Sequence, residues 1–300
     1  MVEERLVDPV RIDASLVKRL VTRQFPMWAD LPIEPVLPGG HDNKTFHLGG
    51  EMSARLPSRK AYAAHVVIEH EWLPKLEPHL PLPIPVPLGK GAPSLDYPWP
   101  WSANRWIEGE TASMDRIADI VEFAKDLASF LNALQSIDAT GGPRPGRHNF
   151  FRGGKLAVYD SETRECIELL QDAINPDAAT SIWEAAVEER SDREPVWVHG
   201  DVAAGNLLVK DGRLCGVIDF GQLAAGDPSC DVTIAWTLFS GHSREVFRSE
   251  LAADEGTWVR GRGWGLWKAL LHLREHRSND PKKAAKAERV VRDILIETPT

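Results

Sequence analysis

The spacing of apolar residues changes along this 300-residue chain and divides it into two kinds of region. Apolar residues from 16 to 21 recur at helical spacing behind Asp13, which predicts an N-capped amphipathic helix. From 33 to 56 the pattern becomes short runs broken by two glycine pairs, which predicts three strands joined by turns. A helix is expected at 62–76, and the five prolines between 78 and 87 then impose an extended path.

A strand-like segment from 97 to 110 ends in a glycine turn, and the helical spacing of apolar residues from 117 to 137 then predicts a long helix. Further helices are expected at 161–174 and 182–189, and the carboxyl-terminal tryptophans and leucines predict a buried helix. The pattern therefore indicates an α+β chain of two lobes, with the boundary at about 104–109. The predicted lobes are a small sheet-containing lobe at 1–107 and a larger, mostly helical lobe at 108–300.

Composition narrows the class of protein. Hydrophobic residues make up 43% and charged residues 26%, which is ordinary for a globular protein. There is no apolar stretch of about 18 residues and no secretion signal at the start, so we expect no membrane partner and a cytoplasmic location. Cys166, Cys215 and Cys230 have no metal-ligand spacing. The net charge of -9 argues against a nucleic-acid partner, and monomer and homodimer remain open.

The segment from 195 to 221 contains the residues with the strongest chemical pattern. Two apolar runs flank Asp211-Gly212, a dipeptide that favours a type I′ hairpin turn. That hairpin puts Asn206 and Asp219 on one face as diagonal neighbours, and their oxygens are the kind that magnesium prefers. Asp201, five residues before Asn206, could accept or orient the proton of an attacking hydroxyl.

His199-Gly200-Asp201, Asn206 and Ile218-Asp219-Phe220-Gly221 together resemble the motifs of the aminoglycoside phosphotransferase family, which is related to protein kinases. The resemblance is specific over about forty residues and extends more weakly from Val36 to Trp267. It implies a two-lobed protein-kinase-like fold, with Asp201 as the catalytic base and Asn206 and Asp219 as Mg2+ ligands. His199 would brace the catalytic loop, although a buried histidine can also be purely structural.

The resemblance also implies a phosphate-binding loop at 37–45. Its glycines, Gly39 and Gly40, would let the backbone approach the phosphates of ATP or GTP, with Asn43 and Thr45 following.

The same resemblance implies a cationic strand residue paired with a helix glutamate. Arg55 stands where the family has lysine, and an arginine fork can bind both phosphate and carboxylate. Its partner would be Glu69, with Glu71 as the alternative. The adenine edge would meet the backbone of a hinge that begins at Asn104. The remaining hinge residues are Arg105, Trp106 and Ile107.

The residues after Phe220-Gly221 leave no room for the long activation segment of a protein kinase, so a small-molecule acceptor is expected. Asp227 and Asp231 would be structural hydrogen-bond acceptors. An acidic group near Trp258 could neutralise the amines of an aminoglycoside, or could be surface charge. Its members are Glu250, Asp254 and Glu255.

The predicted activity is transfer of the γ-phosphate of ATP or GTP to a substrate hydroxyl, with an aminoglycoside-type antibiotic as the expected acceptor. A macrolide or a metabolic alcohol such as choline, homoserine or a sugar is the alternative acceptor. A metal-dependent phosphoesterase and an inactive nucleotide-binding protein are more distant alternatives.

Overall fold

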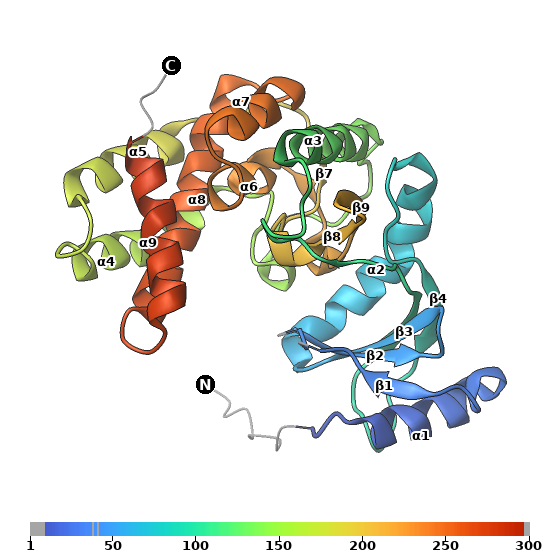
Figure 1. Ribbon diagram of the computed structural model, residues 1–300. Coiled ribbons are helices and arrows are strands. Elements are labelled where there is room, and N and C mark those ends of the chain that lie inside the picture. The colour runs from blue at the N-terminus through green and yellow to red at the C-terminus, as the bar shows by residue number, and fades with distance from the viewer. Residues whose placement is uncertain (1–9, 38, 41, 297–300) are drawn as a thin grey trace. The chain divides into compact units, whose positions relative to one another are not determined.

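The computed structural model describes residues 10–37, 39–40 and 42–296 (Figure 1). Positions 38 and 41 of the predicted phosphate loop therefore lie outside the described residues. The chain divides into two compact units. The first unit comprises Met1–Pro78, Pro83–Glu108 and Val217–Gly221, and the second comprises His79–Leu82, Gly109–Gly216 and Gln222–Thr300.

The first unit is built on a five-stranded antiparallel sheet in the order β1-β2-β3-β5-β4. Its strands and helices are α1 (Ala14–Gln24), β1 (Ile33–Pro35), β2 (Asn43–Leu48), β3 (Met52–Pro57), α2 (Ala63–Leu76), β4 (Pro87–Gly91) and β5 (Trp101–Arg105). The three strands predicted between 33 and 56 are present as β1, β2 and β3. The turn between β2 and β3 uses Gly49, whose φ of 67° suits glycine.

Helix α1 forms because its sequence has both a cap and an apolar face. The Asp13 side chain accepts a hydrogen bond from the Leu16 amide at 3.0 Å, as the sequence predicted. The four buried apolar residues of this face join one core with side chains of the sheet. They are Leu16, Val17, Leu20 and Val21. Burial of each contributes roughly 1.5–3 kcal/mol, so this face holds α1 on the sheet.

The second unit is mostly helical (Figure 1). Its helices are α3 (Ile120–Ser136), α4 (Asp160–Leu169), α5 (Pro176–Glu188), α6 (Ile234–Thr237), α7 (Gly241–Glu250), α8 (Glu255–His276) and α9 (Pro281–Ile296). Its strands are β6 (Glu110–Thr111), β7 (Val196–Val198), β8 (Leu207–Lys210), β9 (Arg213–Val217, whose last residue belongs to the first unit) and β10 (Ala224–Gly226). The small sheet and the helical carboxyl-terminal part confirm the predicted α+β class.

Helix boundaries differ from the predicted ranges where capping residues set them. Helix α3 begins at Ile120, because Asp119 accepts hydrogen bonds from the amides of Val121 and Glu122. Helix α5 begins at Pro176, earlier than predicted, because Asn175 caps it and proline suits a first helical position. The capping residues therefore set helix boundaries that differ from those predicted by apolar periodicity alone.

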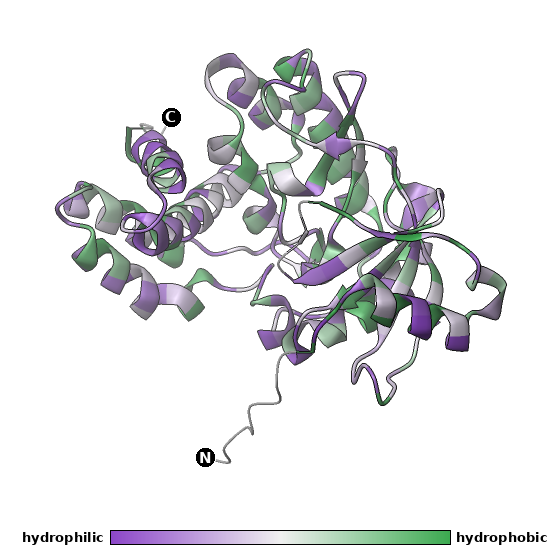
Figure 2. Ribbon diagram, turned by 60° about the horizontal axis from the view of Figure 1, so that its bottom comes forward, coloured by the Kyte–Doolittle hydropathy of each residue, from purple (hydrophilic) through white to green (hydrophobic). Residues whose placement is uncertain are grey.

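Helix α8 contacts α4, α5 and α9, and most of its length is buried. Hydrophilic and hydrophobic residues alternate along α9, the helix that leads to the C mark in Figure 2, and its buried side chains include Val291 and Ile294. Among the described residues, none of the helices is both long and apolar enough to cross a membrane.

Candidate active site

In the first unit, Arg55 holds two carboxylates. Its Nη1 lies 3.2 Å from Glu69 Oε1 and its Nη2 lies 2.9 Å from Asp219 Oδ1. Arg55 comes from β3, Glu69 from α2, and Asp219 from the 217–221 segment that belongs to this unit. The fork of the guanidinium suits this arrangement, because its nitrogens can serve two acceptors at once.

The environment of these charges shifts two pKa values. Burial alone would lower the pKa of Arg55, but the charges of Glu69 and Asp219 outweigh it and raise that pKa. Burial raises the pKa of Glu69, and the nearby Arg55 charge opposes this without cancelling it. With both acids ionised, one cation faces two anions. The cluster therefore has one negative charge in excess, which fits a site that takes a further cation.

Of the two glutamates that the sequence left open, Glu69 contacts Arg55. The Glu69 side chain is 5% exposed, whereas that of Glu71 is 55% exposed and lies 3.9 Å from Lys75. Asp219 has a φ of 66°, a strained backbone for a residue that is not glycine. Such strain persists only where the surroundings impose it, and it occurs often at functional sites.

The expected hinge follows β5. The Arg105 amide donates to the Val86 carbonyl at 2.9 Å, and the Trp106 amide donates to the Glu51 carbonyl at 2.8 Å. These two amides are therefore already used within the first unit. Ile107 follows them in the chain.

The residues of the expected phosphate loop are divided between a strand and the segment before it. Asn43 and Thr45 lie in β2, opposite Pro57 and Arg55 of β3. Gly39 and Gly40 precede β2. Thr45 therefore shares a register position with Arg55, which brings the expected phosphate loop and the cationic residue to one region of the sheet.

In the second unit, the loop after β7 is fixed by a buried carboxylate. The amides of His199 and Gly200 each donate to Asp231 at 2.8 Å, and Asp231 is fully buried. Gly200 has a φ of 85°, and a Cβ there would collide with the backbone of Gln222, so no larger residue fits. Burial raises the pKa of Asp231, while His199 and the two amides oppose this rise. The loop is therefore held at its start by backbone contacts.

Asp201 lies in this loop and contacts His199, Asn206 and Lys268 of the second unit. Its amide donates to His199 Nδ1 at 3.2 Å. The Asn206 side-chain nitrogen donates to the Asp201 carbonyl at 2.9 Å and to its Oδ2 at 3.2 Å. Lys268 Nζ, from α8, lies 2.6 Å from Asp201 Oδ1. Because the amide nitrogen of Asn206 faces Asp201, its amide oxygen remains the atom suited to a metal.

Asp201 stays ionised at neutral pH because of its cationic neighbours. Burial alone would raise the pKa of this carboxyl group, but the charge and hydrogen bond of Lys268 outweigh it. Arg152 and His199 contribute in the same direction, and the pKa falls below its ordinary value. An ionised carboxylate is the state that can accept a proton from a hydroxyl.

Asp227 serves as a structural acceptor. It accepts hydrogen bonds from the Ser229 amide and hydroxyl at 3.2 and 3.0 Å, and it pairs with Arg260 Nε at 2.6 Å. These contacts join the segment after Gly221 to Arg260 of α8. The hydrogen bonds to Asp231 join the same segment to the loop after β7.

The acidic group expected to bind amines lies around the start of α8, and two of its members, Asp254 and Glu255, have partners within the protein. Asp254 caps α8 by accepting from the Thr257 amide at 2.7 Å. Glu255 pairs with Arg248 at 2.6 Å. Glu250 is the last residue of α7 and its side chain is exposed.

Sequence reasoning missed Lys268 and Arg152. Lys268 follows Trp267 in the mostly apolar run of α8 from Trp264 to Leu271, and a lysine within such a run was the available signal. Arg152 follows Phe150 and Phe151, both with positive φ, in a loop without periodicity, so no sequence signal marked it.

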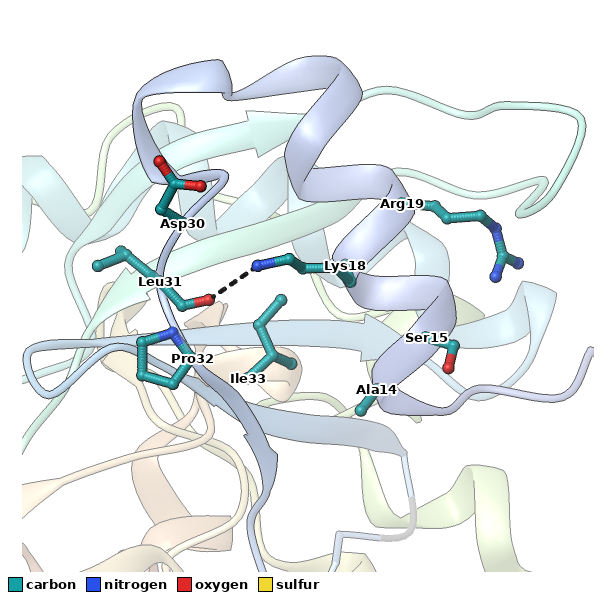
Figure 3. Close-up of a pocket in the computed structure, with 8 residues that line it drawn as sticks. All are labelled: Ala14, Ser15, Lys18, Arg19, Asp30, Leu31, Pro32 and Ile33. Atoms are coloured by element: carbon teal, nitrogen blue, oxygen red, sulfur yellow. Dashed lines mark hydrogen bonds between the residues drawn. The ribbon is translucent and has the colours of Figure 1, made fainter.

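Two pockets lie apart from the side chains of Asp201, Asn206 and Asp219. One, of ≈ 580 Å³, lies between α1 and the segment leading into β1, where Lys18 donates to the Leu31 carbonyl at 3.3 Å (Figure 3). The other, of ≈ 760 Å³, is in the second unit and is lined by Asp227 and Arg260 among others. None of the candidate site residues lines either pocket. Among the described residues, no group of three or more His, Cys, Asp or Glu side chains could hold a metal.

Comparison with known proteins gives a family and a fold. The profile of the phosphotransferase enzyme family matches residues 34–269. No curated protein matches by sequence. Wild-type aminoglycoside 2'-phosphotransferase-IIIa in complex with GDP is 17% identical with a TM-score of 0.68, over 95% of this chain and 99% of that chain.

Two further solved structures share the fold. The streptomycin and ATP complex of APH(2")-IIa is 19% identical with a TM-score of 0.58, over 97% of this chain and 98% of that chain. The apoenzyme of macrolide 2'-phosphotransferase from Brachybacterium faecium is also 19% identical with a TM-score of 0.58, over 93% and 97%. The predicted kinase-like fold is confirmed by these neighbours.

Proposed function

This chain belongs to the phosphotransferase enzyme family, and we propose that it transfers the γ-phosphate of ATP or GTP to a hydroxyl group of a small molecule. One observation carries the proposal: the carboxylate of Asp201 is held by Lys268 and Asn206 in a loop fixed by buried hydrogen bonds. A carboxylate that is oriented and kept ionised in this way can serve as a general base.

In this proposal Asp201 orients the acceptor hydroxyl and takes its proton. Lys268 uses one lone pair of Oδ1 and Asn206 uses one of Oδ2. A carboxylate has about four lone-pair sites, so capacity remains for the hydroxyl. The low pKa of Asp201 keeps the acceptor site on this carboxylate open at neutral pH.

Asn206 and Asp219 are the proposed Mg2+ ligands, assigned by the sequence spacing and the family resemblance. Two observations fit this assignment. The Asn206 nitrogen is engaged by Asp201, which leaves its oxygen as the ligand atom, and Asp219 belongs to a cluster with an excess negative charge. Bound there, magnesium would neutralise charge on the nucleotide phosphates.

The nucleotide would bind to the first unit. Arg55 donates to Glu69 from Nη1, and a phosphate oxygen would compete with Asp219 for Nη2. Gly39 and Gly40 would let backbone amides approach the phosphates. At the hinge, the Arg105 and Trp106 amides are already used, so the base edge would meet the Arg105 carbonyl and the Ile107 amide.

The test is nucleotide turnover by the purified chain, with magnesium and a panel of hydroxyl compounds. Replacing Asp201 by Asn keeps its size but removes the base, so we expect kcat to fall by about 10²–10⁴-fold with little change in nucleotide affinity. Asp172→Asn is the matched control, because Asp172 pairs with Arg277 at an exposed position. Full activity of Asp201→Asn would exclude Asp201 as the base.

The same assay addresses the distant alternatives. A metal-dependent phosphoesterase would release phosphate from a phosphomonoester without nucleotide. An inactive nucleotide-binding protein would bind the magnesium nucleotide and give no turnover with any acceptor.

A further inference from the structure

We propose that Arg152 is an oxyanion-binding residue of the second unit, and that its Nη groups hold a phosphate or carboxylate group beside the loop that carries Asp201. This site is separate from the nucleotide phosphate site, which is proposed for the first unit. Its basis is a buried arginine for which the described residues provide no ion pair. Binding of an oxyanion stands by itself, whereas the part of Arg152 in the reaction rests on the proposed function.

Arg152 is buried, and contacts on two sides hold its side chain. The residue is 8% exposed. Its Nε donates to Gln222 Oε1 at 2.9 Å, and its guanidinium lies 5.1 Å and 4.9 Å from the ring centroids of Trp264 and Trp267. Tyr159 stacks on Trp267 with the ring centroids 4.0 Å apart, so the aromatic support is itself packed. These contacts fix the orientation of the guanidinium.

The two Nη groups of Arg152 have no hydrogen-bond acceptor among residues 10–37, 39–40 and 42–296. A guanidinium has five N–H groups, and the bond to Gln222 uses one of them. Neither Nη atom is both fully enclosed and without a partner, so these N–H groups reach solvent. Arg152 therefore presents a forked donor, the geometry that binds phosphate and carboxylate groups through two parallel hydrogen bonds.

The carboxylates on the elements around Arg152 have other partners. They are Asp201 with Lys268, Asp227 with Arg260, Asp231 with the amides of His199 and Gly200, Glu162 with Arg274, and Glu275 with His276. In the part of the chain that the structure describes, none of them forms an ion pair with Arg152, so they meet its charge only at longer range. Buried arginines are almost always paired, and the tryptophan faces offset only part of the cost of burying this charge. An anionic ligand would supply the missing partner.

The loop that carries Arg152 has a strained backbone. Phe150 and Phe151, neither of them glycine, have φ values of 52° and 53°. The Phe151 amide donates to the Gly146 carbonyl at 2.8 Å, and the Tyr159 hydroxyl donates to the Phe150 carbonyl at 2.7 Å. Such strain persists only where the surrounding structure imposes it, and it occurs often at functional sites. The strain fits a loop that is held so as to present Arg152.

Two lines of contact join Arg152 to the loop that carries Asp201. Gln222, its hydrogen-bond partner, packs so closely on the residue before Asp201 that a Cβ there would collide with the Gln222 backbone. Trp267, which supports its guanidinium, is followed in α8 by Lys268, the partner of Asp201. An oxyanion on Arg152 would therefore lie near the hydroxyl that Asp201 receives.

Two groups can supply this oxyanion: an anionic group of the acceptor, or the phosphoryl group during its transfer. In both cases the covalent changes are those of the proposed reaction. The acceptor oxygen bonds to the γ-phosphorus, the bond from that phosphorus to the nucleoside diphosphate breaks, and the hydroxyl proton goes to Asp201. With an anionic acceptor, Arg152 would select the substrate. With the phosphoryl group, it would stabilise the negative charge that develops during transfer.

Binding is tested by NMR on the full chain, with inorganic phosphate as the probe. The arginine Nε–H signal that is lost in Arg152→Lys identifies Arg152. We expect this signal to shift saturably with added phosphate and to stay in place with sodium chloride at matched ionic strength. The signal of Arg213, which pairs with Asp126 at an exposed position, is the matched control and should not move. An Arg152 signal that does not shift, or that shifts equally with chloride, would overturn the site.

The source of the oxyanion is tested by turnover of Arg152→Met with pairs of acceptors that differ in charge, such as glycerol with glycerate and sorbitol with gluconate. If the acceptor carries the oxyanion, we expect KM for the hydroxy acids to rise about tenfold while the neutral compounds are unaffected. If the phosphoryl group supplies it, kcat should fall about tenfold for every acceptor at unchanged KM. Arg152→Lys should recover part of either loss, because it keeps the charge without the fork.

Arg213→Met is the control for turnover and should keep the wild-type kcat and KM, and thermal unfolding of each variant checks that the fold is intact. Wild-type constants in Arg152→Met for every accepted compound would overturn the part of Arg152 in the reaction. If no hydroxyl compound stimulates turnover, the proposed function fails, and the phosphate titration of the Arg152 signal alone decides the site.

Discussion

Each unit contains a cluster of charged side chains, and the two clusters differ in their ratio of carboxylates to cations. In the first unit one cation, Arg55, is shared by two carboxylates. In the second unit one carboxylate, Asp201, pairs with one cation, Lys268, and the start of its loop is held by a second, buried carboxylate, Asp231. The first cluster therefore has more carboxylates than cations and favours a further cation, whereas in the second cluster Lys268 balances the charge of Asp201.

The clusters also differ in burial, so we expect mutations in them to differ in how much they lower the stability of the fold. The Arg55 and Glu69 side chains are 13% and 5% exposed, whereas those of Lys268 and Asp201 are 25% and 23% exposed. Breaking a buried pair leaves a desolvated charge, whereas water can replace the lost partner in a partly exposed pair. We therefore expect mutations in the first cluster to lower stability as well as nucleotide binding, and those in the second to affect mainly the reaction.

The largest effect on stability is expected from Arg55→Met. This change leaves Glu69 buried without its cation, and we expect the free energy of unfolding to fall by about 3–5 kcal/mol. Denaturant unfolding measures it. Adding Glu69→Gln should recover part of the loss, because the buried charge is then removed. A loss below about 1 kcal/mol would contradict the difference between the clusters.

A loss of about 2–3 kcal/mol is expected from Asp231→Ala. The amides of His199 and Gly200 would then lose their buried acceptor. We also expect kcat to fall, because these amides fix the start of the loop that carries Asp201. Asp231→Asn keeps one acceptor oxygen and should lie between the wild type and the alanine variant in both unfolding and turnover. Equal stability of all three proteins would exclude this bracing role.

A smaller effect on stability, with a clear effect on pH dependence, is expected from Lys268→Met. Without this cation, burial dominates and the pKa of Asp201 rises, so the acid limb of kcat/KM moves to higher pH. Asp201 has a depressed pKa when folded, so its contribution to stability is present above its unfolded pKa and is lost as pH falls. Because the pair is partly exposed, we expect the unfolding free energy to change by about 1 kcal/mol or less.

The pH profile of Lys125→Gln is the control for this prediction, since its lysine pairs with Glu122 at an exposed position. An acid limb that does not move in Lys268→Met would show that Lys268 does not control the ionisation of Asp201.

Local sequence chemistry predicted the parts of the fold that depend on neighbours in the chain. The Asp211-Gly212 turn has φ values of 52° and 80°, both positive as a type I′ turn requires. Asp13 caps its helix as expected. The roles assigned to Asp201, Asn206 and Asp219 remain predictions, because they came from spacing and family resemblance.

What the sequence could not predict depends on contacts between distant segments. Lys268 is 67 residues from Asp201, and the apolar pattern of its helix shows that one face is buried without showing what it meets. Helical periodicity likewise could not choose between Glu69 and Glu71, two residues apart on one helix. The choice required the packing of α2 on the sheet, where it contacts β4 and β5 and turns the side chain of Glu69 to Arg55.

The smallest effect is expected from Glu71→Gln, which sharpens the comparison within a single helix. Glu71 is exposed and its pair with Lys75 is 3.9 Å long, so we expect the free energy of unfolding to change by less than about 0.5 kcal/mol. The same substitution at Glu69, 5% exposed and 3.2 Å from Arg55, removes a buried charge partner and should change both stability and nucleotide affinity. Denaturant unfolding and nucleotide titration of the two variants measure the contrast. Equal effects of the two substitutions would mean that burial beside Arg55 does not distinguish these two carboxylates.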